Sequence, residues 1–182
     1  MTAPSSTPPP ALTLSSIDSP IGRLALACDA AGAVRGLSFA GPEGDGLARA
    51  MRREYPDAAL SEGATPSAVA AVLAAYFDGD REALQRAPWS LDGARAGDGF
   101  QARVWRALAE VPAGVTISYG EMARRAGEPG AAQAAGVALN RNPIPLLLAC
   151  HRVVGADGGM VGFGGGLERK TWLLRHEGAL LI

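Results

Sequence analysis

The stretch SYGEMARRAGEPGAAQAAGVALN, residues 118–140, decides the fold of the second half of the chain. It begins with Ser118 and Glu121, which have the S-x-x-E spacing of a capping box at the start of a helix. This spacing predicts a helix over Tyr119–Ala126. Gly127 follows directly, and glycine is favoured at the end of a helix because it adopts the left-handed conformation without strain.

A second helix is predicted after the tight turn EPG at 128–130. It runs from about 131 to 140, and Asn142-Pro143 ends it. Two short helices joined by a turn that contains glycine are typical of a helix-turn-helix. The second helix is rich in alanine and glycine. These small side chains have two interpretations: a close contact with another helix, or a close approach of the backbone to DNA.

An earlier helix is predicted where apolar residues recur at helical spacing. Asp98 is its candidate N-cap, with Gln101 three residues later. The stretch 112–114, Pro-Ala-Gly, stops it. The apolar residues at this spacing are Phe100, Val104, Leu108 and Val111. The second half of the chain is therefore predicted to be mainly helical.

The first half contains three short segments of alternating apolar residues, which predict β-strands. Two segments with helical periodicity follow. The predicted strands are Leu12–Asp18, Arg23–Cys28 and Ala33–Phe39, and the predicted helices are Gly46–Tyr55 and Pro66–Phe77, the latter with Val69, Val72, Leu73 and Tyr76 on one face. This order of elements predicts a small α/β domain.

The whole chain is thus predicted to be an α/β (α+β) protein with two domains. The connection between them is rich in Asp, Gly, Arg and Pro, which is typical of a linker. The predicted divisions are a disordered tail at 1–11, an α/β domain at 12–78, a linker at 79–98 and a helix-turn-helix domain at 99–182.

Composition narrows the class of protein. The 182 residues are 48% hydrophobic and carry a net charge of −1, which is typical of a globular protein and not of a basic coat on nucleic acid. No apolar run reaches the roughly 18 residues that span a bilayer, and the N-terminus lacks the features of a signal peptide. The two cysteines, Cys28 and Cys150, form no disulfide framework, so we expect a cytoplasmic protein without membrane contact.

The segment NPIPLLLACHRVV, residues 142–154, carries the candidate chemistry. Cys150 stands at the end of an apolar run and is followed by His151. A thiolate is the nucleophilic form of cysteine, and a neighbouring base or positive charge raises its fraction. Taken alone, the Cys-His pair also fits a cysteine of the apolar core.

The whole segment closely resembles the active-site signature of the O6-alkylguanine-DNA alkyltransferases, usually written Pro-Cys-His-Arg-Val. The similarity extends over about the last 83 residues, from FQARVW at 100–105 to GGLERK at 165–170 and LLRHEG at 173–178. The segment SPIG at 19–22 also resembles the opening hairpin of this family. The resemblance implies a ribonuclease-H-like first domain and a helix-turn-helix second domain.

The resemblance also implies a role for each residue of the reaction centre. Cys150 is expected to accept the alkyl group. His151 is expected to act as a base through a water molecule, and Glu177 to orient the imidazole. Asn142 is expected to tie the end of the helix-turn-helix to the active-site loop.

A further group is expected to bind the damaged base after it is flipped out of the duplex. Tyr119 would hydrogen-bond the guanine and crowd the neighbouring phosphate. The carbonyls of Cys150 and Val153 would accept from the guanine amine, and the N–H of Gly164 would donate to O6. The residues expected to line the pocket are Leu139, Pro145 and Phe163.

Two positions depart from the family pattern. Ala149 stands where the family usually has proline, so we expect a looser turn and a modest effect on the position of the thiol. Gln133 stands where the family usually has an arginine that fills the gap left by the flipped nucleotide. Glutamine can hydrogen-bond an orphaned base, but it brings no charge, which predicts weaker lesion search and flipping.

No cofactor and no metal are expected. Some members of the family hold a structural zinc in the first domain, with cysteine and histidine ligands. A tetrahedral zinc site needs four ligands, and the first half of this chain has only Cys28 and no histidine. Cys28 is expected in the core of a strand. His176 is expected at the surface or at a helix end.

These features predict a single-turnover methylated-DNA–protein-cysteine S-methyltransferase that repairs O6-alkylguanine, with O4-alkylthymine as a further candidate lesion. It would act as a monomer on double-stranded DNA. The alternative is a non-repairing sensor that grips alkylated guanine and recruits another pathway; Cys150 favours the enzyme, and Gln133 favours the sensor. A transcription regulator is the weakest reading, because the second helix has few base-reading side chains.

Overall fold

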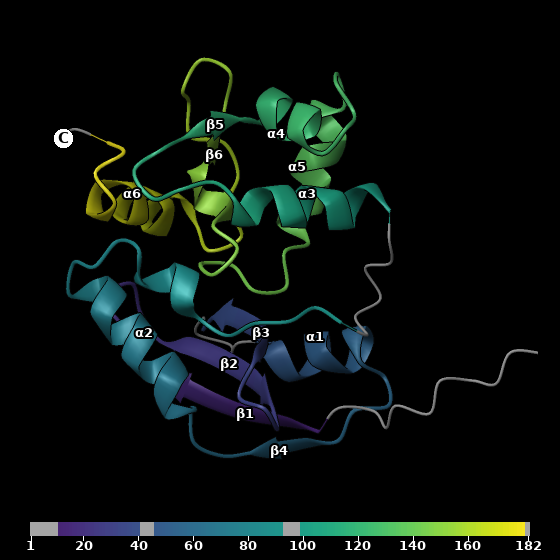
Figure 1. Ribbon diagram of the computed structural model, residues 1–182, viewed down its shortest axis with the longest axis vertical. Helices are drawn as coiled ribbons and strands as arrows, with labels where there is room; N and C mark the ends of the chain where they lie inside the picture. Colours follow the sequence, from purple (N-terminus) through teal and green to yellow (C-terminus); the bar gives the residue numbers. More distant parts are fainter. Residues whose placement is uncertain (1–10, 41–45, 93–98, 181–182) are drawn as a thin grey trace, which may run out of the picture.

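A computed structural model describes residues 11–40, 46–92 and 99–180. Figure 1 shows two units, with the sheet, α1 and α2 in the lower one and α3 to α6 in the upper one. The predicted tail, apart from Ala11, and the predicted N-cap Asp98 lie outside the described residues. The predicted mixed α/β class is confirmed.

The first unit is built on a four-stranded sheet in the order β3-β2-β1-β4. β1 (Leu12–Ile17), β2 (Leu24–Asp29) and β3 (Val34–Phe39) form an antiparallel meander close to the predicted bounds. β4 (Leu60–Glu62) pairs parallel with β1 and was not predicted, because its three residues carry no alternation that could reveal a strand.

Two helices cover opposite faces of this sheet: α1 (Leu47–Glu54) and α2 (Ser67–Phe77). Successive side chains of a strand point to opposite faces, and β2 is buried on both. The residues Leu24, Leu26 and Cys28 join the larger core with α2, whereas Ala25 and Ala27 join a smaller core with Leu47 and Met51 of α1. Cys28 is therefore a core residue, as expected.

The predicted linker is wrong for its described first part. Residues 83–86 form the 3-10 helix η1, in which Ala83 and Leu84 are buried in the larger core. Trp89 then forms a β-bridge with Val34 of β3. Apolar residues scattered among Asp, Gly and Arg anchor this segment, so its composition was a poor guide to its packing.

Over residues 99–180, the second unit contains four α-helices, one 3-10 helix and a short parallel strand pair. The elements are α3 (Phe100–Ala109), β5 (Ile117–Ser118), α4 (Tyr119–Arg125), α5 (Ala132–Asn140), the 3-10 helix η2 (Cys150–Arg152), β6 (Val153–Val154) and α6 (Leu167–His176). β5 pairs with β6, which brings the start of the helix-turn-helix beside the end of the Cys-His-Arg segment.

The helix-turn-helix forms as predicted from its capping residues. The Ser118 hydroxyl accepts from the N–H of Glu121 at 3.1 Å. Gly127 has φ +83°, the left-handed conformation that glycine adopts without strain. On α5, Ala135 and Ala138 are buried, and Trp105 of α3 donates to the Ala138 carbonyl at 2.8 Å. This face of α5 thus makes the close helix contact that its small side chains allow.

The two units share one apolar core. It joins side chains of β2, β3 and α2 to side chains of α3, α4, α5 and α6. The second unit is therefore packed against the first and not tethered to it. Within the described residues, no helix is both long and apolar enough to cross a membrane.

Candidate active site

The loop between α5 and Cys150 is fixed by Asn142. Its side-chain amide donates to the Leu148 carbonyl at 2.7 Å, and its Oδ1 accepts from the N–H of Ile144 at 3.1 Å. Asn142 thus connects the end of α5 to the residues just before Cys150. Leu146 within this loop has φ +78°, a left-handed conformation that costs a non-glycine residue about 1–3 kcal/mol. Its side chain is fully buried, which offsets that strain.

A tight turn at Ala149 leads into Cys150. Ala149 has φ −74° and ψ 62°, and the N–H of Cys150 donates to the Leu148 carbonyl at 2.7 Å. These angles and this bond define an inverse γ-turn. The value of φ also lies within the range that proline imposes, so the backbone holds here, with alanine, the conformation that a proline would fix.

Behind the cysteine lies a buried group of charges centred on Glu177. His151 and Glu177 have no exposed surface. The His151 Nε2 lies 2.9 Å from Glu177 Oε1. Arg152 holds the same carboxylate through two bonds, from Nε to Oε2 at 2.9 Å and from Nη2 to Oε1 at 2.8 Å.

These contacts determine the protonation of the pair. Burial opposes ionisation of Glu177, but hydrogen bonds and positive charge from His151 and Arg152 outweigh it and hold the pKa of the carboxyl well below its usual range. Burial lowers the pKa of His151, against the opposing effect of Glu177. A neutral imidazole that donates from Nε2 leaves Nδ1 as the basic nitrogen, and Nδ1 makes no hydrogen bond to a described residue.

The surroundings of the Cys150 thiol favour its protonated form at neutral pH. Burial raises its pKa to about 11, although a hydrogen bond with Asn142 and the charge of Lys170 act in the opposite direction. The increase in thiolate fraction that a neighbouring base or positive charge can cause is therefore outweighed by burial at Cys150. Desolvation of the thiolate outweighs the neighbouring groups, and a separate proton acceptor is needed when the sulfur reacts.

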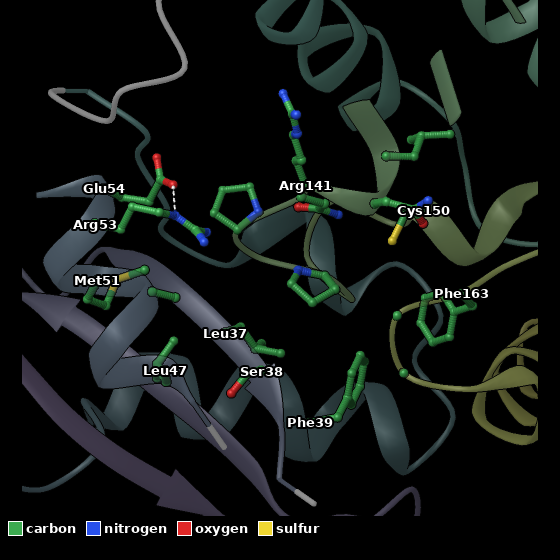
Figure 2. Close-up of a pocket in the computed structure, with 18 residues that line it drawn as sticks. Leu37, Ser38, Phe39, Leu47, Met51, Arg53, Glu54, Arg141, Cys150 and Phe163 are labelled. Carbon is green, nitrogen blue, oxygen red and sulfur yellow. Dashed lines mark hydrogen bonds and ion pairs between the residues drawn. The ribbon is translucent and has the colours of Figure 1, made fainter. Parts of the chain in front are cut away.

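Cys150 opens onto a cavity between the two units. In Figure 2 its sulfur points into this space, with Phe163 nearby. The cavity has a volume of about 320 Å³. Six of the predicted site residues line it: Leu139, Asn142, Pro145, Cys150, Phe163 and Gly164. The first unit contributes the opposite wall through β3 and α1, a contribution that was not predicted.

The glycine-rich segment that carries Phe163 is held over the site by Tyr119 and Lys170. The Tyr119 hydroxyl donates to the Val161 carbonyl at 3.1 Å. The ammonium group of Lys170 is buried and donates to the carbonyls of Val153 at 2.6 Å and Val161 at 2.9 Å. Two residues expected to contact guanine, Tyr119 and Val153, therefore already have protein partners.

Phe163 is supported from the first unit. Its ring lies 5.6 Å from that of Phe39 in β3. The Arg169 guanidinium stands 5.3 Å above Phe39 and donates to the carbonyls of Ile21 and Gly165 at 2.7 and 2.9 Å. Arg169 thus connects the β1–β2 hairpin of the first unit to the cavity wall that the second unit provides.

Gln133 lies apart from this cavity. It is exposed near the start of α5, beside the exposed Ala134. Val137, one turn further along, is 48% exposed. The solvent-facing side of α5 near Gln133 therefore carries short, uncharged side chains.

Comparison with known proteins places these features in one family. Residues 99–179 match the family described as 6-O-methylguanine DNA methyltransferase, DNA binding domain. A methylated-DNA–protein-cysteine methyltransferase of Methanosarcina acetivorans is 36% identical over 162 residues, which cover 89% of this chain and 96% of that protein. The chain belongs to the methylated-DNA–protein-cysteine methyltransferase family.

Other relatives agree with this assignment. The methyltransferase of Salmonella typhimurium is 44% identical over 117 residues, which cover 64% of this chain and 66% of that protein. The matched part thus spans just under two thirds of that relative. A crystal structure of Mycobacterium tuberculosis OGT in complex with DNA superposes with a TM-score of 0.71 at 37% identity, covering 92% of this chain and 93% of that one.

The site also contains three buried polar side chains that were not among the predicted site residues: Arg152, Lys170 and Tyr76. Arg152 and Lys170 lie in two segments that resemble the family, HRVV and GGLERK. They were not predicted as buried site residues, because a charged residue is expected at the surface unless its partners are known. Tyr76 was predicted only to lie on the apolar face of a helix. Its hydroxyl donates to Glu177 Oε1 at 2.8 Å, a contact between units that spacing along the chain could not reveal.

Within the described part of the chain, no group of three or more His, Cys, Asp or Glu side chains is placed to hold an ion. His176 ends α6 and donates from Nε2 to the Tyr76 carbonyl at 2.6 Å, which agrees with the predicted helix-end position.

Proposed function

We propose that this protein repairs DNA by transferring an alkyl group from guanine O6 to the sulfur of Cys150. One observation carries the proposal: a half-buried thiol opens onto a cavity, next to a fully buried His151–Glu177 pair whose free imidazole nitrogen can take a proton. A neutral imidazole can accept the proton of the neutral thiol when the sulfur reacts.

The reaction needs one proton transfer and one displacement. The thiol proton passes to His151 Nδ1 through a water molecule, and Glu177 stabilises the resulting imidazolium. The sulfur attacks the alkyl carbon, the bond from that carbon to O6 breaks, and its electron pair remains on guanine. The Gly164 N–H donates to the leaving O6, and the proton returns from His151 to the guanine. The product is a thioether that nothing in the site hydrolyses, so the protein acts once.

The proposed substrate is O6-alkylguanine in double-stranded DNA, with O4-alkylthymine as a further lesion. An alkyl group on O6 is enclosed in the duplex, so the nucleotide must be flipped into the cavity. The helix-turn-helix would bind the duplex, with Gln133 at the gap. Tyr119 would contact the flipped guanine by exchanging its bond to Val161, and Leu139, Pro145 and Phe163 would enclose it. We also propose that the protein acts as a cytoplasmic monomer.

Intact mass spectrometry tests this function. After incubation with a duplex that contains O6-methylguanine, we expect a gain of one methyl group per chain on the peptide that holds Cys150. Cys150→Ser should remove the gain, whereas Cys28→Ser should retain it because Cys28 is buried in β2. An unchanged mass with excess lesion DNA would refute the transfer.

The second candidate is a sensor that binds alkylated guanine without repairing it. The neutral surface around Gln133 favours the sensor, because a helix without the usual arginine would contact DNA differently. Tight and lesion-dependent binding by a protein whose mass never changes would establish the sensor in place of the enzyme.

A further inference from the structure

A tyrosine of the first unit reaches the carboxylate behind the reactive thiol. Tyr76 of α2 is fully buried, and its hydroxyl donates to Glu177 Oε1 at 2.8 Å. The same oxygen faces His151 Nε2 at 2.9 Å. The phenol, the imidazole and Arg152 Nη2, at 2.8 Å, therefore share one acceptor atom, although Tyr76 and Glu177 stand 101 residues apart in the chain.

The ring of Tyr76 is held from two sides. It packs edge-on against Phe77, with 5.2 Å between ring centroids, and against His176, at 5.0 Å. His176 stacks on Trp172 of α6 and donates to the Tyr76 carbonyl at 2.6 Å. Backbone and ring are thus both fixed against α6, so the hydroxyl has little freedom to leave the carboxylate.

We infer that Tyr76 is a positioning residue for the alkyl transfer, whose hydroxyl orients Glu177 and limits how strongly this carboxylate acts on His151. The inference rests on the proposed function, in which His151 accepts the thiol proton. It assigns the first unit a part in the chemistry besides closing the cavity.

The hydroxyl acts by sharing the negative charge of Glu177. A donor on Oε1 reduces the charge available to His151, so its removal should stabilise the imidazolium. Arg152 and Lys170 face His151 from η2 and α6, and their positive charges act against the imidazolium. Both remain when the hydroxyl is removed. Burial and the charge of Glu177 raise the pKa of Tyr76, so the phenol stays a donor at every working pH.

Tyr76→Phe tests the inference because it keeps the ring and removes the donor. With the free base O6-benzylguanine, which needs no flipping, we expect the rate of alkyl transfer to fall about tenfold because Glu177 loses a donor that holds it in line with His151. A loss of this size is of the order that a hydrogen bond to a charged group contributes. The acid limb of its pH profile should move upward by about half a unit, because His151 must be neutral to accept the proton.

Tyr55→Phe is the matched control. Tyr55 is also a buried tyrosine of the first unit, but it packs in the smaller core with α1. We expect its pH profile to remain that of the unmodified protein. The chain has only two histidines, so nitrogen NMR of histidine-labelled protein can follow the titration of His151. That titration should move upward in Tyr76→Phe and stay in place in Tyr55→Phe.

A second replacement reverses the expected sign. 3-Fluorotyrosine in place of Tyr76 keeps the fold but is a more acidic phenol, hence a stronger donor, so the acid limb and the His151 titration should move downward. This variant decides the question if Tyr76→Phe does not fold. A fall in rate with no movement of either profile would reduce Tyr76 to a packing residue. If the unmodified protein transfers no alkyl group, the proposed function fails, while the NMR titrations still report whether Tyr76 acts on His151.

Discussion

The two ends of the proposed active site are built in opposite ways. At the chemical end, Glu177 is fully buried and hydrogen-bonded to His151, Arg152 and Tyr76. At the DNA end, Gln133 is exposed on a helix face of small neutral residues. Changes at the chemical end should therefore alter stability and reactivity together. Changes at the DNA end should alter DNA binding and base flipping, and leave the reactivity of the thiol and the stability of the protein unchanged.

The largest effect is expected for Glu177→Ala. It leaves the Arg152 guanidinium buried without its carboxylate, and breaking a buried pair in this way costs about 3–5 kcal/mol. Urea unfolding should show this loss in the free energy of unfolding. Glu121→Ala is the control, because its ion pairs with Arg124 and Arg125 lie at the surface. Equal losses in the two variants would show that the buried group does not hold the chemical end together.

The next effect concerns the pH dependence of the thiol. A thiol whose pKa is raised to about 11 stays protonated at neutral pH, and its thiolate fraction keeps growing as pH rises toward that value. In a Cys28→Ser background, the rate of Cys150 alkylation by iodoacetamide should still be rising above about pH 9, where an ordinary thiol of pKa about 8.5 levels off. A short peptide with one cysteine is the reference. A midpoint at or below that of the peptide would contradict the desolvated thiol.

A smaller effect is expected at the DNA end, for Gln133→Arg. An arginine can stack, hydrogen-bond an orphaned base and interact favourably with the negative field of the groove. We expect duplex binding to tighten about tenfold, with the salt dependence steeper by about one unit of slope. Transfer from duplex should become faster, while reaction with free O6-benzylguanine should barely change.

Ala134→Arg separates position from charge, because it adds the same charge at the adjacent exposed residue. It should steepen the salt dependence without accelerating transfer. If Gln133→Arg accelerates both reactions equally, or if the two variants behave alike, Gln133 does not occupy the gap left by the flipped nucleotide.

The smallest effect is expected for Ala149→Pro. Because φ at Ala149 is −74°, proline fits the turn and restricts the unfolded chain, which should raise the free energy of unfolding by less than about 1 kcal/mol. Leu148→Pro is the contrast: the N–H of Leu148 donates to the Ile144 carbonyl at 2.9 Å, so proline there should destabilise the protein strongly. Thermal unfolding of both variants measures the difference. A strong loss at Ala149 would mean that the turn requires alanine.

Local signals in the sequence predicted the local structure. The capping box at Ser118 and Glu121 and the glycine at 127 correctly placed α4, and alternation placed the first three strands close to their bounds. The family resemblance predicted that Cys150, His151 and Glu177 act together, and the structure brings His151 and Glu177 to 2.9 Å. Features that depend on tertiary contacts were missed, including the buried side of Tyr76, the anchoring of residues 83–89 and the raised pKa of the thiol. These depend on burial, which spacing along the chain does not encode.

The contact between Tyr76 and Glu177 has a consequence for how the protein reaches its working state. Bringing together residues 101 positions apart requires closure of a long loop, and such contacts slow folding relative to local ones. Cys150 and His151, by contrast, are neighbours from the moment of synthesis. The Cys150–His151 pair therefore exists before Tyr76 reaches the carboxylate beside it, and this complete group of side chains forms only when the two units dock. For the single alkyl transfer proposed here, assembly itself then limits when the reaction can take place.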